Sequence, residues 1–119
     1  MSHCDGVTIS LFHVSMDIKV TAANIDYDIY TLKPGEAVRI ESVSMAQVNG
    51  TGALTGVIRR KVQGVMTDLH TAITALDDGG KHYADAFWLH YPCTLQMGLL
   101  STVADDMARV TFDGYAYRR

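Results

Sequence analysis

The sequence predicts an all-β fold: an antiparallel β-sandwich of jelly-roll type, with about eight strands, that occupies residues 1–119 as a single domain. Two observations carry this prediction. Val, Ile and Thr supply 29 of the 119 residues, whereas Glu and Lys, which usually cover exposed helix faces, supply only 6. Pro-Gly, Asn-Gly and Asp-Gly signals also separate runs of alternating apolar and polar residues, as expected for short strands joined by turns.

The chain begins with two predicted strands. Alternation over residues 7–20 predicts the first, and its apolar phase slips at Phe12, which predicts a bulge or corner. Residues 25–29 form the second. The segment 33–36, Lys-Pro-Gly-Glu, then predicts a type II turn, because Pro presets φ and Gly supplies a positive φ.

A third predicted strand starts at Val38 and changes phase at Ser42-Val43. It ends at Asn49-Gly50, a dipeptide that predicts a hairpin with residues 54–62 as the return strand. Gly64 breaks the chain before residues 65–76. In that segment, apolar residues occur at spacings that also suit a short helix, so both strand and helix remain open.

The last third of the chain predicts three strands. The run Asp-Asp-Gly-Gly at 77–80 predicts a reversal, and residues 83–91 carry apolar side chains on both faces, which predicts a central strand. Pro92 ends that strand because proline cannot donate to a ladder. Strands at 95–103 and 108–117 complete the fold.

Charge and hydropathy exclude several classes of function. The net charge of -3, with no basic tract, argues against a nucleic-acid binder that relies on phosphate contacts. No stretch of about 18 uncharged apolar residues occurs, so membrane spanning lacks support. The first five residues have neither a basic nor an apolar leader region, and we expect a protein that is intracellular when it is made.

The histidines and cysteines lack the spacing of a metal site. His82 and His90 would share one face of a strand but lie about 26 Å apart at ~3.3 Å per residue, and no His-x-His occurs. His3 and Cys4 match no ligand pattern. We interpret Cys93 as a small core residue, since a nucleophile would need a base such as His90 beside it in space.

Three pairs of carboxylates could act as general acid and base or bind Ca²⁺, but two of them are interpreted as turn residues. Two of the three pairs fall in predicted turns, where Asp side chains bond to nearby backbone, and no glycine-rich phosphate loop is present. The pairs are Asp26 with Asp28, Asp77 with Asp78, and Asp105 with Asp106. The sequence therefore predicts no catalytic residue, no cofactor and no metal, and so no enzyme. A small β-barrel enzyme with a His and Asp pocket drawn from distant strands remains an alternative.

Aromatic residues gather near two predicted strands. They are Tyr83, Phe87, Trp88 and Tyr91 near one strand and Tyr115 and Tyr117 on the last. Phe87 and Trp88 point to opposite faces of one strand, so at least one of them faces away from the core. Such side chains are suited to burial against a partner chain, or to stacking on a sugar.

Three segments resemble small accessory virion proteins of tailed bacteriophages: LKPGEAVRIESVS at 32–44, YPCTLQMG at 91–98 and ARVTFDGYAY at 108–117. The resemblance implies a non-enzymatic protein that decorates or cements a capsid, or joins head to tail, as a homo-oligomer bound to other virion proteins. It implies a location in the virion after synthesis in the host cytoplasm. No residue role is carried over from the family.

We expect Trp88, Tyr91, Tyr115 and Tyr117 to supply contact area in an interface. In this hypothesis, basic side chains pair with acidic neighbours in a partner; they are Arg118, Arg119 and the run Arg59-Arg60-Lys61. The alternative function is a carbohydrate-binding or receptor-binding module of a fibre or spike. It would use the same aromatic residues, with Asp85 or Asp113 bonding to hydroxyl groups.

Overall fold

The computed structural model describes the backbone of residues 2–4, 6–20, 24–49, 54–75, 81–83, 86–101 and 106–119. These residues form strands and turns, and none of them is helical. The strands are β1 (Ser2–Cys4), β2 (Val7–Val20), β3 (Asn24–Thr31), β4 (Glu36–Asn49), β5 (Leu54–Val62), β6 (Val65–Ala75), β7 (Lys81–Tyr83), β8 (Phe87–His90), β9 (Thr94–Ser101) and β10 (Asp106–Arg118). No helix of the described part is long and apolar enough to cross a membrane.

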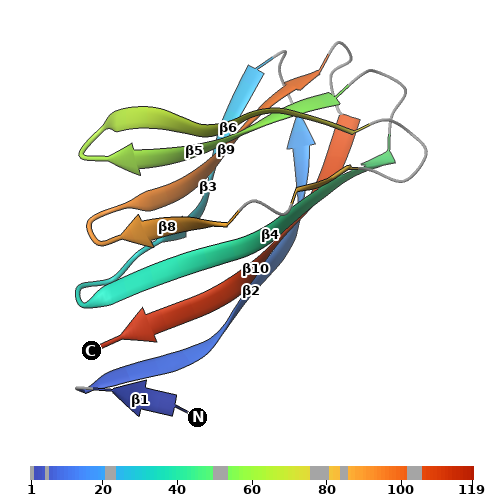
Figure 1. The fold of residues 1–119 in the computed structure, drawn as a ribbon. Helices are drawn as coiled ribbons and strands as arrows, with labels where there is room; N and C mark the ends of the chain where they lie inside the picture. The colour runs from blue at the N-terminus through green and yellow to red at the C-terminus, as the bar shows by residue number, and fades with distance from the viewer. Residues whose placement is uncertain are drawn as a thin grey trace.

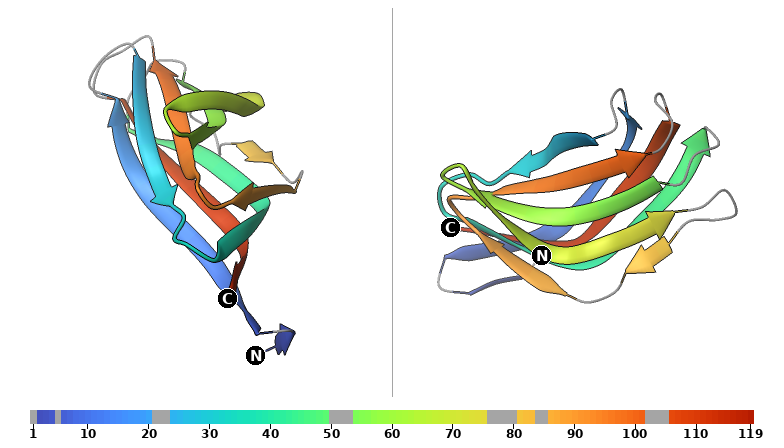
Figure 2. Two further views of the ribbon diagram at one scale, coloured as in Figure 1. Left: turned by 90° about the vertical axis from the view of Figure 1, so that its left-hand side faces the viewer. Right: turned by 90° about the horizontal axis from the view of Figure 1, so that it is seen from above.

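The strands form two antiparallel sheets that pack face to face (Figures 1 and 2). Sheet A has the order β1-β2-β10-β4, and both β7 and β8 pair with β4 at its far edge. Sheet B has the order β3-β9-β5-β6. The chain repeatedly crosses from one sheet to the other, which is the connectivity of a jelly roll. The predicted fold class is confirmed, with β7 and β8 as two pieces of one edge and β1 as a short addition.

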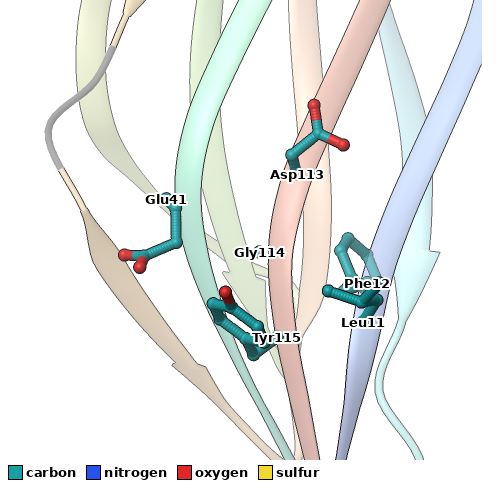
Figure 3. Close-up of a pocket in the computed structure, with 6 residues that line it drawn as sticks. All are labelled: Leu11, Phe12, Glu41, Asp113, Gly114 and Tyr115. Carbon is teal, nitrogen blue, oxygen red and sulfur yellow. The ribbon is translucent and has the colours of Figure 1, made fainter.

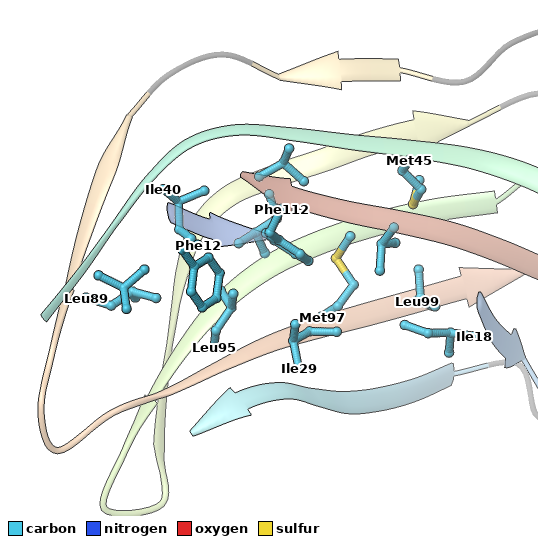
Figure 4. Packing of buried hydrophobic residues seen from close by; sticks show 14 of the residues in the cluster. Phe12, Ile18, Ile29, Ile40, Met45, Leu89, Leu95, Met97, Leu99 and Phe112 are labelled. Carbon is cyan, nitrogen blue, oxygen red and sulfur yellow. The ribbon is translucent and has the colours of Figure 1, made fainter. Parts of the chain in front are cut away.

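The core lies between the sheets and is built by alternate residues of each strand (Figure 4). From sheet A, the central strand β10 contributes Val110, Phe112 and Ala116, all fully buried. From sheet B, β9 contributes Leu95, Met97 and Leu99. Phe12 of β2 contacts Tyr30 of β3 edge-on, with ring centroids 5.1 Å apart. This packing fixes which face of each sheet remains for solvent or a partner.

The predicted bulge in the first strand is wrong. β2 pairs with β10 from Thr8 to Val20 without a register shift. Phe12 and the even-numbered residues after it point to the core, so Leu11 is left on the opposite face of the same strand. The change of apolar phase therefore marks a second apolar face, not a corner.

The phase change predicted at Ser42-Val43 is confirmed. Asp113 of β10 faces Ser42, whereas Gly114 faces Ile40, so Glu41 is an extra residue in β4. This β-bulge lets Ile40 and Val43 both point into the core. The type II turn at 33–36 is also confirmed: Gly35 has φ +79°, and the Glu36 N–H donates to the Lys33 carbonyl at 3.0 Å.

The hairpin predicted at Asn49-Gly50 is wrong. Strand β5 exists as predicted, but it joins sheet B, where it pairs with β9 and β6, whereas β4 belongs to sheet A. Residue 50 itself lies outside the described residues, as does the predicted reversal at 77–80. The dipeptide marked where the chain leaves a strand and did not indicate which sheet the next strand joins.

Residues 65–75 form strand β6, so the helical alternative for this segment is wrong over the part that the structure describes. The residues before it form a tight two-residue loop, with positive φ at Gln63 and Gly64 and with Val62 paired to Val65. The predicted central strand at 83–91 is also wrong. Tyr83 ends the short strand β7 and residues 87–90 form β8, and both strands pair with β4 at the edge of sheet A.

Candidate functional site

The outer face of sheet A gathers three of the aromatic residues that the sequence singled out, Trp88, Tyr115 and Tyr117. Because β10 lies between β2 and β4, its outward side chains have neighbours on both sides. Tyr115 pairs with Leu11 and Arg39, and Tyr117 pairs with Ile9 and Ala37. On the far side of β4, Trp88 is the register partner of Arg39. Rows of side chains therefore run across four strands.

Trp88, His90, Tyr117 and Arg39 form a cluster, here called the aromatic cluster. The Trp88 ring lies 5.1 Å from that of Tyr117 and is stacked on that of His90 at 5.8 Å. The Arg39 guanidinium lies 5.8 Å from the Trp88 ring centroid, within range of a cation–π contact. Trp88 remains 41% exposed, while Phe87, on the other face of β8, packs against the core. The expectation that one of these two aromatic residues faces outward is confirmed.

Next to this cluster lies a shallow hollow of about 240 Å³ (Figure 3). Its rim is formed by Leu11, Glu41, Asp113 and Tyr115, and backbone at Gly114 and Phe12 forms its floor. Glu41 stands at the rim because of the β4 bulge.

The carboxylates at the rim are both paired with neighbouring cationic groups. Nδ1 of His13 lies 2.5 Å from Oδ1 of Asp113. Nε of Arg39 lies 2.9 Å from Oε2 of Glu41, a charge contact without the alignment of a hydrogen bond.

The predicted interface residues divide into two groups. Trp88, Tyr115 and Tyr117 share the outer face of sheet A, whereas Tyr91 lies in the bend after β8 and donates its N–H to the Glu36 carbonyl. The side chain of Arg118 forms its hydrogen bonds within its own chain. Its Nε donates to Oε2 of Glu36 at 2.7 Å and its Nη1 to the Ser10 hydroxyl at 2.9 Å.

Glu36 is a buried carboxylate held by several donors. Besides Arg118, the Tyr30 hydroxyl and the Lys33 N–H donate to it, at 2.8 and 3.1 Å. Burial alone would raise the pKa of Glu36, but these hydrogen bonds outweigh burial and hold the pKa below its usual value. Arg119 stays exposed, with its N–H bonded to the Gly35 carbonyl. This cluster fastens the end of β10 to the turn between β3 and β4.

Two residues of the basic run at 59–61 form ion pairs within the chain. Arg59 contacts Asp26 at 2.6 Å and Asp68 at 2.9 Å, and Lys61 contacts Asp28 at 3.3 Å. These ion pairs cross the outer face of sheet B. The hydrogen bond from Gln96 is the largest influence on the pKa of Asp28 and, together with Lys61, lowers it against the opposing effect of burial. Asp26 and Asp28 thus lie on strand β3, and their side chains form ion pairs across sheet B.

Cys93 is buried in the core, as predicted, and burial raises the pKa of its thiol, which disfavours the nucleophilic thiolate. The single strand expected to carry His82 and His90 is divided between β7 and β8. Among the described residues, no group of three or more His, Cys, Asp or Glu could hold a metal ion. The side chains of Cys4 and His3 lie outside the described residues, as does Asp85.

Sequence reasoning missed Leu11, Arg39, His13 and Glu41 as members of the outer face. Their strand positions were available, but their neighbours depend on the β2–β10 and β4–β10 registers. One signal pointed to Leu11: the apolar run Val7, Ile9, Leu11 fits the face opposite to Phe12. The structure shows that this run belongs to the outer face of β2 and not to the predicted bulge.

The fold and its outer face define a jelly-roll β-sandwich with an exposed aromatic surface. The sequence matches no protein-family model and no curated protein. A protein of Bacillus endospore appendages, described as disulfide-linked pili, superposes with a TM-score of 0.58 at 18% identity over 99% of this chain and 96% of that chain. A chain of the cyanophage Pam1 capsid gives 0.56 at 14% identity, covering 100% and 91%.

A third similar structure is a virus-like particle of the extra small virus of the prawn Macrobrachium rosenbergii. Its TM-score is 0.53 at 12% identity, covering 98% of this chain and 82% of that chain. At such identities the likeness shows a shared fold.

Proposed function

We propose that this chain is a non-enzymatic structural subunit of a virion that assembles through protein–protein contacts on the outer face of sheet A. The finer assignment is a decoration, cement or head–tail accessory protein of a tailed bacteriophage. Its partners are other virion proteins and further copies of the chain, and its location is the virion. No cofactor, nucleic acid or membrane takes part.

One observation carries the proposal. The aromatic cluster and Tyr115 place large, partly exposed side chains on an open sheet face, where nothing in the described chain covers them. Aromatic residues and arginine are enriched in the cores of protein interfaces, and Arg39 stands against Trp88 in this cluster. The fold adds support, since similar structures include a capsid chain, a virus-like particle and a pilus protein.

Self-assembly is tested by light scattering over a dilution series, with negative-stain images of the same samples. We expect the wild-type protein to remain oligomeric on dilution. The double variant Trp88→Ala/Tyr117→Ala should dissociate to a smaller species because it loses the exposed contact area. Its matched control is Tyr27→Ala, which removes a tyrosine that is exposed on the edge strand β3 of sheet B.

Circular dichroism of each variant verifies that the fold is intact. A wild-type protein that is monomeric at every concentration would contradict the proposed self-assembly. Assembly of the double variant with wild-type affinity would contradict the assigned surface.

The carbohydrate-binding alternative has one observation in its favour. Asp113, which the sequence analysis named as a hydroxyl partner, lies at the rim of the hollow beside Tyr115. Aromatic rings can stack on sugars while a carboxylate accepts their hydroxyl groups. Binding to a glycan array that Tyr115→Ala abolishes, without any change in oligomeric state, would favour this alternative.

A further inference from the structure

The apolar surface of sheet A extends beyond the aromatic cluster. Leu11 is 81% exposed on the outer face of β2 and stands beside Tyr115, which is 39% exposed. In the next row, Ile9 stands beside Tyr117. These residues make one contiguous surface with Trp88, not scattered apolar side chains. Contiguous apolar surface of this kind marks an interaction site.

The surface carries a projection and a cavity next to each other. Leu11 projects from β2, and the hollow floored by Gly114 lies directly beside it, between Leu11 and Glu41 (Figure 3). Two copies of this one face can therefore fit each other in shape. If one copy is turned over onto another, each Leu11 meets the hollow of the other copy.

The charges on this face permit such a contact. Asp17 pairs with Arg109 at 2.8 Å, and this pair lies on the same face as the His13–Asp113 and Arg39–Glu41 pairs. Among the described residues of the face, these acids are each paired with a base from the same face. Two copies therefore meet without repulsion between clusters of like charge on the two faces.

The face is also large enough. The molecule measures 50 × 29 × 19 Å, and sheet A forms one of its two broad sides. A stable interface needs about 800 Å² from each partner. This is roughly half of the area given by the two longer dimensions, so partial overlap of two faces suffices.

We propose that the partner on this face is a second copy of the chain, related by a two-fold axis, with Leu11 of each copy seated in the hollow beside Tyr115 of the other. A two-fold contact is self-complementary, because residue i meets residue j and residue j meets residue i. Leu11 and the hollow are such a reciprocal pair on one surface. This inference rests on the proposed function, and it names the partner and the geometry of the same site.

The first test compares two leucines on opposite faces. Leu11→Asp places a charge where a leucine is to be buried, and we expect self-association to weaken at least tenfold in sedimentation equilibrium. Leu100→Asp is the matched control, because Leu100 is 41% exposed on the outer face of sheet B. It should associate like the wild type. If Leu11→Asp associates like the wild type while Trp88→Ala/Tyr117→Ala dissociates, the two-fold contact is wrong and the proposed function stands.

The second test determines the symmetry. The variant Leu11→Cys/Glu41→Cys, in a Cys4→Ser background, places thiols on opposite sides of the hollow, on strands separated by β10. Under mild oxidation, a two-fold contact yields a closed covalent dimer and no larger product on a non-reducing gel. A ladder of trimers and higher species would show a head-to-tail contact and overturn the inference, as would the absence of any cross-link. A wild-type chain that never associates would overturn the proposed function as well.

Discussion

Gly114 of β10 packs directly against the backbone carbonyl oxygen of Arg39 in β4. A Cβ on residue 114 would overlap that oxygen and would also contact the Arg39 carbonyl carbon at 2.9 Å. The close approach occurs where the register shifts at the β4 bulge. It therefore links the floor of the hollow to the bulge that places Glu41 at its rim.

We expect Gly114→Ala to lower the free energy of unfolding by about 2–4 kcal/mol, because the obstructing atom belongs to the backbone and cannot move aside. The matched control is Gly98→Ala in β9. A Cβ there overlaps the tip of the Arg59 side chain, which can rotate away at the cost of exposed ion pairs worth about 1 kcal/mol or less each. Urea unfolding measures both variants. Equal losses at the two positions would contradict the assigned cause.

The buried carboxylate of Glu36 predicts a dependence of stability on pH. Its pKa in the folded protein lies below the usual value of 4.5, because hydrogen bonds from Tyr30, Lys33 and Arg118 outweigh the opposing effect of burial. The unfolded chain therefore binds a proton more readily than the folded one. The stabilisation from Glu36 is fully present above about pH 4.5 and is lost as the pH falls through the folded value.

Glu36→Gln should cost about 1–3 kcal/mol at pH 7, since it removes the charge that Arg118 faces, and the loss should shrink at acidic pH. Urea unfolding at pH 7 and at pH 3 measures this difference. Glu41→Gln is the control, because Glu41 sits in an exposed pair. If the cost of Glu36→Gln is the same at both pH values, the carboxylate does not stabilise the fold through its charge.

The loop between β5 and β6 offers a stabilising substitution. Gln63 has φ +50° and is followed by Gly64 at +83°, the conformation of a type I′ turn, in which Asn-Gly is favoured. Gln63→Asn should raise the free energy of unfolding by about 0.5 kcal/mol, and Gln63→Val should lower it by about 1 kcal/mol, because a β-branched residue resists positive φ. Thermal unfolding compares them. A rise in stability with Val would contradict this turn geometry.

Local chemistry explains the parts of the fold that the sequence predicted correctly. β-branched composition and two-residue alternation predicted the strands, and Pro34-Gly35 predicted the turn between β3 and β4. These signals succeed because they act within a few residues. The phase change in β4 coincides with its bulge, because the strand must keep both Ile40 and Val43 in the core.

The errors share one cause, which is that sheet membership is not a local property. Asn49-Gly50 is a good hairpin signal, but the next strand enters sheet B. Residues 83–91 carry apolar side chains on both faces of the predicted strand, yet β7 and β8 lie at the edge of sheet A. The outward aromatic residue Trp88 contacts Tyr117 of β10. In the sequence, the pattern of an exposed apolar face is the same as that of a face buried in a core.

The candidate site shows the same division. The sequence alone indicated that at least one of Phe87 and Trp88 faces away from the core, because adjacent residues of a strand point to opposite faces. The same alternation places Tyr115 and Tyr117 on one common face of the last strand. Only the tertiary structure decided that these residues share one face with Leu11 and Arg39, and that Arg118 is held by Glu36. The physical reason is register: strands far apart in the chain become neighbours through backbone hydrogen bonds whose alignment depends on the packing of both sheets.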